Sequence, residues 1–416
     1  MIFTGFQPNA TKKDITTALS YLLLPWKWGK VIKGGEYEAK ACRILRKKFS
    51  VYHTYLFDSG RSALEVALKA LGVGEGDEVI VQAYTCVVVI NAIKWVGAIP
   101  VYVDVRQDFN IDVSKIKEKI SPKTKAIIAQ HTFGIPCEID KVVHIAKEHN
   151  IAVIEDSAHV IEGEYKGKKL GTYGDIGMFS FGTDKVISCG RGGALIAMND
   201  VIGEKIGAVY EKIQYPKRWW ILPYLWNFPL FVIGKTLYKI KIGKLLLAGL
   251  KKLSITGRVI YEKEKQGIRS HFKVSRLASS LCHILCNQLE VLGEVNEHRT
   301  EIARWYHEEI GTKKVEKPQK LNGSFYVRYP VLVPEPAKVM TYFKNRGILL
   351  GDWYDTVIGP DDIRLEKTGY VIGTCPVAEN LAKHSLNLPT SQKISVKQAD
   401  TICQLLKKYY DDGETN

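Results

Sequence analysis

The sequence predicts an α/β protein with a mainly parallel mixed sheet flanked by helices and a smaller α+β domain at its C-terminal end. The chain has 416 residues, more than the roughly 250–300 at which one core stops growing, so two domains are expected. Between Asp58 and Ala197, short β-branched runs alternate with helical stretches, which is typical of βα units. From Leu277 onward, apolar residues recur at helical intervals, which indicates a different organisation.

The elements of the large domain follow from these patterns. The expected strands are Val79–Gln82, Pro100–Asp104, Ala126–Gln130, Ala152–Glu155, Gly177–Phe181 and Gly193–Ala197, and the expected helices are Ser62–Leu71, Val87–Val96 and Lys141–His149. The periodic run after Leu277 predicts one long helix or two abutting helices.

In the smaller domain, Tyr326–Val333 is expected to form a strand, and Val339–Arg346 and Ala399–Lys408 to form helices. These patterns divide the chain into an N-terminal segment (1–30), a large domain (31–205), a basic and aromatic insertion (206–262), a connecting helical region (263–310) and a small C-terminal domain (311–416).

Composition narrows the class of protein. An apolar share of 46% and a charged share of 25% are ordinary for a globular chain. The eight cysteines contain no CxxC pair, which favours reduced thiols in the cytoplasm. Cys282 and Cys286 could share a helix face, but no further ligand completes a metal site, so no metal is expected. The N-terminus lacks a secretory signal, and the longest uncharged run, Trp219–Gly234, is shorter than a membrane span.

Two short motifs provide groups suited to an anionic cofactor. Asp58–Leu64 (DSGRSAL) places small residues at a helix start, where backbone N–H groups and the helix dipole can bind phosphate. A simple N-cap is the alternative explanation. Ile154–His159 (IEDSAH) places Asp156 at the end of a buried strand, the edge where α/β sheets bind ligands. Asp156 could hold a pyridine nitrogen protonated, or it could cap the following turn.

A third motif contains the candidate nucleophile. Lys185 follows an apolar strand in Phe179–Lys185 (FSFGTDK), and Gly190–Gly193 (GRGG) comes next. Burial would lower the pKa of the lysine and make its amine reactive toward an aldehyde. Taken alone, a lysine after a strand is usually solvated, so the weight of Lys185 comes from the two motifs that precede it.

The order and spacing of these motifs resemble the DegT/DnrJ/StrS aminotransferases, which are fold-type-I pyridoxal-phosphate enzymes that often act on nucleotide-linked keto sugars. The resemblance covers nearly the whole chain. It includes the three motifs above and Gly76–Ile80, Gly97-Ala98, Pro100-Val101, Asp104, His131–Asp140 (HTFGIPCEID), Gln288-Leu289, Arg299 and Leu388-Pro389.

The resemblance implies a role for each matching position. Lys185 is the Schiff-base lysine and proton shuttle, and Asp156 is the partner of the pyridine nitrogen. His159 lies near the ring hydroxyl, and Ala158 packs on one ring face. The backbone amides of Gly60 and Arg61 and the hydroxyl of Ser180 hold the phosphate.

The same resemblance implies pyridoxal 5'-phosphate as cofactor, an amino donor, expected to be glutamate, and a keto-sugar acceptor in polysaccharide or glycoconjugate biosynthesis. It also implies a homodimer. Related sugar dehydratases carry histidine in place of the lysine, so Lys185 favours transamination.

The chain departs from the family pattern at several positions that would contact the substrate or stack on the cofactor. Thr85 is followed by Cys86 instead of a stacking aromatic residue, for which Tyr84 is one substitute. Arg191 stands where glutamate is common. His271 and Lys273 occupy the positions of an Asn and an Arg, which leaves open the substrate and the contact between subunits.

The basic charge is concentrated. The net charge is +15, and residues 205–276 hold 16 Lys and Arg against three acids. With Trp219, Trp220, Trp226 and Phe228 nearby, residues 217–252 resemble a segment for peripheral membrane contact, at the inner face of the membrane. Packing on a partner subunit or over the active site is the alternative. No nucleic-acid motif accompanies the lysines, so nucleic acid is not an expected partner.

Two other functions stay open from the sequence. One is a lyase or dehydratase reaction on the same cofactor, and the other is a membrane-associated regulatory protein that keeps the fold without turnover.

Overall fold

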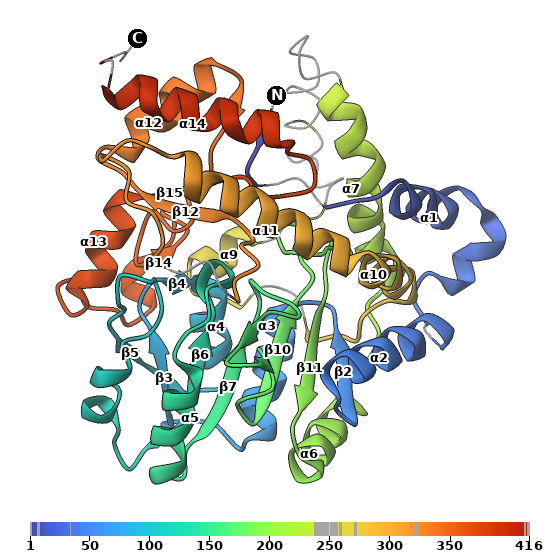
Figure 1. Cartoon of the computed structure of the whole chain (residues 1–416). Coiled ribbons are helices and arrows are strands. Elements are labelled where there is room, and N and C mark those ends of the chain that lie inside the picture. Colours follow the sequence, from blue (N-terminus) through green and yellow to red (C-terminus); the bar gives the residue numbers. More distant parts are fainter. Residues whose placement is uncertain are drawn as a thin grey trace.

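The core of the protein is a seven-stranded sheet, seen at the bottom of Figure 1. The computed structural model describes residues 2–5, 9–33, 35–236, 249, 257, 260–269, 273–319, 323–411 and 413. The strand order is β2-β11-β10-β7-β6-β3-β5, and β11 alone runs antiparallel to its neighbours. The strands are β2 (His53–Phe57), β3 (Glu78–Gln82), β5 (Ile99–Val103), β6 (Thr124–Gln130), β7 (Ala152–Asp156), β10 (Ile176–Ser180) and β11 (Gly193–Ala197).

The predicted fold class is confirmed, and the six predicted strands lie within two residues of the observed ones. Strand β2 was not predicted. Its sequence, HTYLF, begins with polar residues, and only Leu56 and Phe57 are fully buried. An edge strand of this kind, with three partly buried residues that carry polar groups, lacks the continuous apolar run of a central parallel strand.

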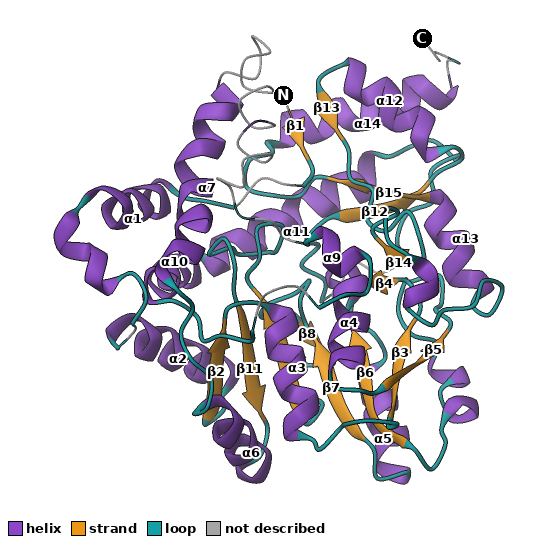
Figure 2. Ribbon diagram, turned by 180° about the vertical axis from the view of Figure 1, so that it is seen from behind, coloured by secondary structure: helices purple, strands orange, loops and turns teal. Residues whose placement is uncertain are grey.

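Helices cover both faces of the sheet (Figures 1 and 2). One face packs against α3 (Gly60–Ala70), α4 (Val87–Trp95) and α6 (Asp200–Tyr210). The other face packs against α5 (Ile139–Glu148), α2 (Glu36–Phe49) and α10 (Ser279–Glu290). Alternate residues of each strand point to opposite faces, and both sets are apolar, which is why the sheet is buried on both sides.

The helices that join the two parts of the chain are α10 and α11 (Leu292–Glu309). They abut at Val291, which caps α11, so the second of the two predicted arrangements is correct. Cys282 and Cys286 lie on α10 and are buried free thiols, which agrees with their expected role as small apolar residues.

The C-terminal part is built from short strands and three helices around α11. Strands β12 (Tyr329–Leu332) and β15 (Ser385–Leu388) pair antiparallel, and β13 (Ile348–Leu349) pairs with β1 (Ile2–Phe3) at the N-terminus. The helices are α12 (Pro336–Asn345), α13 (Pro376–His384) and α14 (Val396–Asp411). Strand β14 (Ile358–Gly359) pairs with β4 (Thr85–Cys86) and so joins this part to the edge of the large sheet.

The remaining elements lie at the outer side of the large domain. They are α1 (Lys12–Leu23), the short helix η1 (Pro25–Lys30) and α7 (Arg218–Thr236), and α1 lies beside α7 (Figure 2). The predicted start of the insertion, residue 206, falls inside α6, which continues to Tyr210 and covers β2. The short helix α9 (Glu262–Lys265) follows, and small strands β8 (Glu164–Tyr165) and β9 (Lys168–Lys169) form a hairpin.

Candidate active site

The floor of the candidate site forms where β7 and β10 end side by side. Asp156 ends β7 and Ser180 ends β10, and the start of α3 lies against them. A Cβ atom on Gly60 would come within 3.1 Å of the Ser180 Cβ, and one on Gly193 would come within 2.6 Å of the Gly60 nitrogen. Glycine is therefore required at both positions for the helix start to approach the strand ends.

The start of α3 is suited to an anion. Ser59 caps the helix, and its hydroxyl accepts a hydrogen bond from the Ser62 amide at 3.3 Å. The amides of the first turn carry the positive end of the helix dipole, and Ser180 adds a hydroxyl on the facing strand. The structure thus brings Gly60, Arg61 and Ser180 together as the sequence predicted.

Lys185 and Asp156 share the interior of the site. Burial lowers the pKa of the Lys185 ammonium from 10.5, although the charges of Cys86 and Asp156 oppose this effect. Burial raises the pKa of Asp156 from 3.8, against a hydrogen bond from the Ala158 amide to Oδ1 at 2.9 Å and the charge of Lys185. The site therefore holds an amine that loses its proton readily and a carboxylate that lacks full charge compensation.

His159 is placed to donate a hydrogen bond into the site. Its Nδ1 accepts the amide hydrogen of Phe133 at 3.1 Å, so the neutral ring carries its proton on Nε2. Burial and the charges of Lys185 and Arg328 hold the pKa of His159 well below 6.5. The ring stays neutral at physiological pH, and Nε2 lies 3.5 Å from the Tyr354 hydroxyl.

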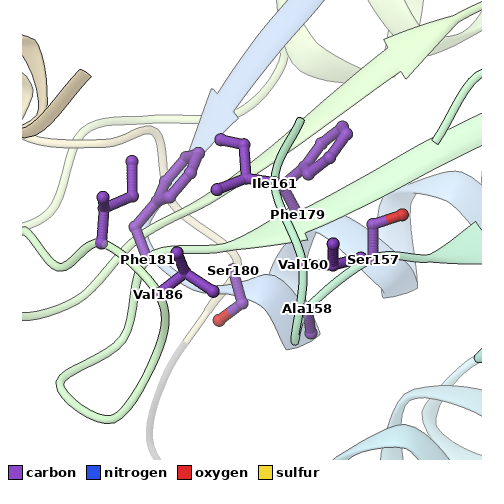
Figure 3. A pocket seen from close by; sticks show the side chains of 9 residues that line it. Ser157, Ala158, Val160, Ile161, Phe179, Ser180, Phe181 and Val186 are labelled. Atoms are coloured by element: carbon purple, nitrogen blue, oxygen red, sulfur yellow. The ribbon is translucent and has the colours of Figure 1, made fainter. Parts of the chain in front are cut away.

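A small pocket lies between the lysine loop and the ends of β7 and β10 (Figure 3). Figure 3 shows Ala158 and Ser180 on neighbouring segments at its lower edge. Its lining is mainly apolar: Ser157, Ala158, Val160, Ile161, Phe179, Ser180, Phe181, Val186 and Ile187. Apolar side chains therefore pack behind the polar groups and hold them in place.

Arg191, which stands where the family commonly has glutamate, is paired with a carboxylate. Its guanidinium donates to Asp58 Oδ2 from Nε at 3.1 Å and from Nη2 at 2.9 Å. Burial lowers the pKa of Arg191, but the charges of Tyr224 and Asp58 outweigh burial and raise it. Arg191 also donates to the Tyr224 hydroxyl at 3.2 Å, and that hydroxyl lies 2.6 Å from the Tyr261 hydroxyl.

This network links α7 to the lysine loop and to α3. Tyr224 lies on α7, and Gly190, in the loop after Lys185, packs directly against it. On the other side, the Tyr261 amide donates to Glu264 at 2.9 Å, and Glu264 forms an ion pair with Arg61. The Arg61 side chain is thus neutralised away from the strand ends, in line with a role for its backbone amide alone.

The other predicted site residues lie in different surroundings. The Tyr84 ring is buried among Phe109, Phe133 and Tyr354, and its hydroxyl donates to Ser385 at 2.8 Å. These contacts with other side chains account for the position of the Tyr84 ring without a cofactor. Cys86 lies near Lys185 and Asp156, and burial raises its pKa. Lys273 is exposed, and His271 lies outside the described residues.

Three site residues were missed by the sequence analysis, and all come from the C-terminal part. The Trp353 ring centroid lies 4.9 Å from Lys185 Nζ and 3.5 Å from the Arg328 guanidinium carbon. Trp353 also stacks on His159, with ring centroids 5.2 Å apart, and Tyr354 follows it. One signal was present: Arg328 interrupts the apolar run predicted as a strand, and a charge inside such a run indicates a buried cation.

No cluster of three or more His, Cys, Asp or Glu side chains in the described part of the chain could hold a metal ion. None of its helices combines the length and the apolar character needed to span a bilayer.

A sheet covered by helices on both faces, with a lysine near a carboxylate and a helix N-terminus at the strand ends, is the arrangement that the resemblance to fold-type-I pyridoxal-phosphate enzymes implies. A family model supports this class directly. The chain belongs to the DegT/DnrJ/EryC1/StrS aminotransferase family, whose model matches residues 16–220 and 241–407. The predicted family and the predicted aminotransferase class are thereby confirmed.

Individual relatives cover most of the chain. A GDP-perosamine synthase of Escherichia coli O157:H7 is 28% identical over 409 residues, or 98% of both chains. A UDP-N-acetyl-3-dehydro-alpha-D-glucosamine 3-aminotransferase of Acidithiobacillus ferrooxidans is 28% identical over 84% of this chain and 82% of its own. A putative sugar aminotransferase of Streptococcus pneumoniae, solved in its PLP-form, superposes with a TM-score of 0.76 at 20% identity over 99% of both chains.

Proposed function

We propose that this protein transfers an amino group from an amino acid, with glutamate as the expected donor, to the carbonyl carbon of a nucleotide-linked keto sugar, using pyridoxal phosphate. The observation that carries the proposal is the shared burial of the Lys185 amine and the Asp156 carboxylate beside the start of α3. The names of the two relatives support a nucleotide-sugar acceptor.

The residues present fit the cofactor. The carboxylate of Asp156 is buried with incomplete compensation, and a protonated pyridine nitrogen would supply the missing positive charge. The close approach of Gly60 to Ser180 leaves backbone amides and one hydroxyl to bind a phosphate. When bound, pyridoxal phosphate supplies an aldehyde that condenses with amines and a ring that withdraws electrons.

Four residues of the protein have separate roles in the proposed reaction. Lys185, whose pKa is lowered by burial, provides the amine that binds the cofactor and would move a proton between the two reacting carbons in each half-reaction. Asp156 keeps its negative charge opposite a ring cation. His159 donates from Nε2, since its Nδ1 is occupied by Phe133. The indole of Trp353 covers the Lys185 amine and limits its contact with water.

The test is transamination by the full-length protein loaded with pyridoxal phosphate. Glutamate should supply nitrogen to one or more GDP- or UDP-linked keto sugars, with 2-oxoglutarate formed in equal amount. Lys185→Ala should abolish turnover, because it removes the amine that carries the proton, and Lys166→Ala, at an exposed lysine, should leave turnover unchanged. Turnover retained in Lys185→Ala, or elimination of water without amine transfer, would contradict the proposal.

We propose that the protein acts as a homodimer. The support is family membership alone, since these sites are expected to lie between subunits. Sedimentation velocity should give twice the chain mass of 46.8 kDa, and a monomer that is fully active would contradict it.

We also propose that the protein binds the cytoplasmic face of a membrane through α7 and η1. Helix α7 is apolar on its inner side, where Tyr224 and Phe228 are buried, and also on its outer side. The outer stripe is partly or fully exposed and consists of Trp219, Leu222, Pro223, Trp226, Leu230 and Ile233. An exposed stripe of this kind indicates a binding surface.

A second segment extends this surface. Trp26 of η1 is 72% exposed and Trp219 is 63% exposed, and Arg218 at the start of α7 lies over the Trp28 ring at 4.7 Å. Residues 15–35 and 212–261 together contain thirteen Lys and Arg and no acid. Exposed tryptophans beside basic residues favour the headgroup region of an anionic bilayer. A two-fold contact between two copies would place like charges against each other.

Flotation tests this surface. The protein should float with vesicles of phosphatidylcholine and phosphatidylglycerol but not with phosphatidylcholine alone. The variant Trp26→Ser/Trp219→Ser should lose about tenfold or more in partitioning. The control Val371→Ser/Ile372→Ser removes exposed apolar residues from the segment that precedes α13, and α13 lies on the opposite side of the molecule from α7 (Figure 1). This control should float normally. Equal flotation of both variants would contradict this surface, as would conversion of a dimer to a monomer by the tryptophan variant.

A further inference from the structure

Arg328 is a buried cation whose partner is missing from the described protein. Its side chain is only 3% exposed, and burial lowers the pKa of its guanidinium from 12.5. Its close contact is the Trp353 ring, 3.5 Å from the guanidinium carbon. Among the described residues, no carboxylate forms an ion pair with it and no hydrogen bond from its nitrogens is seen. A buried charge in this state destabilises a folded protein unless something else compensates it.

Two other buried arginines differ from Arg328, because their guanidinium groups form ion pairs or hydrogen bonds with the protein. Arg191 is paired with Asp58 at 2.9 Å. Arg299 donates to the Val327 carbonyl at 2.9 Å and to the Thr390 hydroxyl at 2.8 Å. Arg328 therefore stands out among the three as the one whose hydrogen-bonding groups are not used by the described protein.

The surroundings of Arg328 leave room for the guanidinium, but none of the described carboxylates lies within ion-pair distance of it. A Cβ atom on Gly5 would lie 2.5 Å from Nη2, and one on Gly351 would lie 3.0 Å from Nη1. Two glycines thus allow the planar group to lie against the backbone. The charges of the Asp184 and Asp352 carboxylates oppose the effect of burial on the pKa of Arg328, but neither carboxylate forms an ion pair with it.

Arg328 also lies beside the reactive lysine. Both the Lys185 amine and the Arg328 guanidinium approach the Trp353 ring, and the charge of Arg328 contributes to lowering the pKa of Lys185. Trp353 keeps part of its surface exposed, and Lys185 is itself only partly buried, so this side of the site is open to a ligand. An anionic group of a ligand that reaches Lys185 comes within reach of Arg328.

We propose that Arg328 is a substrate-binding residue that holds an oxoanion of the reacting ligand beside Lys185. A planar guanidinium binds a carboxylate or a phosphate through two parallel hydrogen bonds. The oxoanion is either the carboxylate of the amino donor or the diphosphate of the sugar nucleotide. The inference rests on the proposed aminotransferase function, because it assigns Arg328 to the substrates of that same site.

The test measures binding without turnover, on protein loaded with pyridoxal phosphate. Glutarate is a dicarboxylate that lacks an amine, and GDP and UDP carry the diphosphate without the sugar. Calorimetry should show that Arg328→Met weakens glutarate or the two nucleotides by about tenfold or more, and that Arg328→Lys restores part of the loss. Loss for glutarate assigns the donor carboxylate, and loss for GDP and UDP assigns the acceptor.

Thermal unfolding supplies a second readout. If Arg328 had a structural role, its replacement would lower the Tm. Arg328→Met should leave the Tm unchanged or raise it, because an uncompensated buried charge is removed. Arg299→Met should lower the Tm, because it leaves buried carbonyl groups without donors.

The proposal is overturned if all three probes bind Arg328→Met as they bind the wild type, if none binds the wild type, or if Arg328→Met lowers the Tm as much as Arg299→Met. The proposed function fails on a separate result, the absence of amine transfer by the wild type.

Discussion

The candidate site has two sides that are built in different ways. The inner wall comes from the large domain, at the ends of β7 and β10, the start of α3 and the loop of Lys185. The cover comes from the C-terminal part and consists of Arg328, Trp353 and Tyr354. In the wall, most charges have partners within the protein, as in the pairs Arg191–Asp58 and Arg61–Glu264. In the cover, Arg328 has no such partner among the described residues.

This difference separates the binding of the cofactor from the choice of substrate in physical terms. Ion pairs such as Arg191–Asp58 hold the wall without a substrate, and Asp156, whose charge is not fully compensated there, is left to pair with the ring cation of the cofactor. A cover with an uncompensated cation gains stability when an anion arrives, which suits the recognition of a substrate. Trp353 joins the two sides, because its ring contacts His159 and Lys185 of the wall and Arg328 of the cover.

The largest expected effect comes from the wall. Asp156→Asn should lower kcat by at least about a hundredfold, because the ring cation loses its charged partner. Steady-state kinetics with glutamate and a keto-sugar nucleotide measures this change. A fall of less than about threefold would remove Asp156 from the chemistry.

Asp156→Asn is also expected to change the thermal stability of the cofactor-free protein. Burial raises the folded-state pKa of Asp156 above its value of 3.8, so its contribution to stability is present below about pH 4 and is lost as pH rises through the folded pKa. Asp156→Asn should therefore raise the Tm of the cofactor-free protein at pH 7 and leave it nearly unchanged near pH 4. A lower Tm at pH 7 would contradict this sign.

A smaller effect is expected from removing the cover. Trp353→Ala should let water reach the Lys185 amine, and its pKa should rise toward 10.5 because burial is what lowers it. The rate at which the cofactor-free protein takes up pyridoxal phosphate depends on the uncharged amine, so its pH midpoint should move upward. Trp28→Ala, at the outer end of the large domain, is the control and should leave the midpoint in place.

The smallest effect concerns the hydrogen-bonded group of Arg191, Tyr224 and Tyr261, here called the brace, which joins α7 to the wall. Tyr224→Phe removes the hydroxyl that accepts from Arg191 and contacts Tyr261. A buried donor left without its acceptor costs about 1–3 kcal/mol, which urea unfolding would detect. Tyr410→Phe removes an exposed hydrogen bond to the Pro334 carbonyl and should cost less than about 1 kcal/mol. Equal costs would show that the brace adds nothing.

The wall could be predicted because each of its residues belongs to a short, continuous sequence motif. Asp156, Ser180 and Lys185 each follow an apolar strand within a few residues, and Gly60 opens a helix, so strand and helix patterns placed them at one sheet edge. The wall partners of Arg191 were not predictable, because Asp58 and Tyr224 lie far away in the chain and meet it only through packing.

The cover was missed for the same reason. Arg328 and Trp353 lie more than a hundred positions from Lys185 in the chain and meet it only through the packing of the C-terminal part on the large domain. Edge strand β2 was missed because its first three residues, His53, Thr54 and Tyr55, carry polar groups and are only partly buried. Tyr84 was considered as a stacking residue from its position beside Cys86, but its ring fills the space between Phe109, Phe133 and Tyr354.

The central claim, that Lys185 carries the cofactor in the inner wall, can be tested by mapping the attachment. The protein loaded with pyridoxal phosphate is reduced with borohydride, digested and analysed by mass spectrometry. The account predicts that the cofactor mass is found on the peptide that contains Lys185 and is absent from Lys185→Ala. Attachment to another lysine, or none in the wild type, would contradict it.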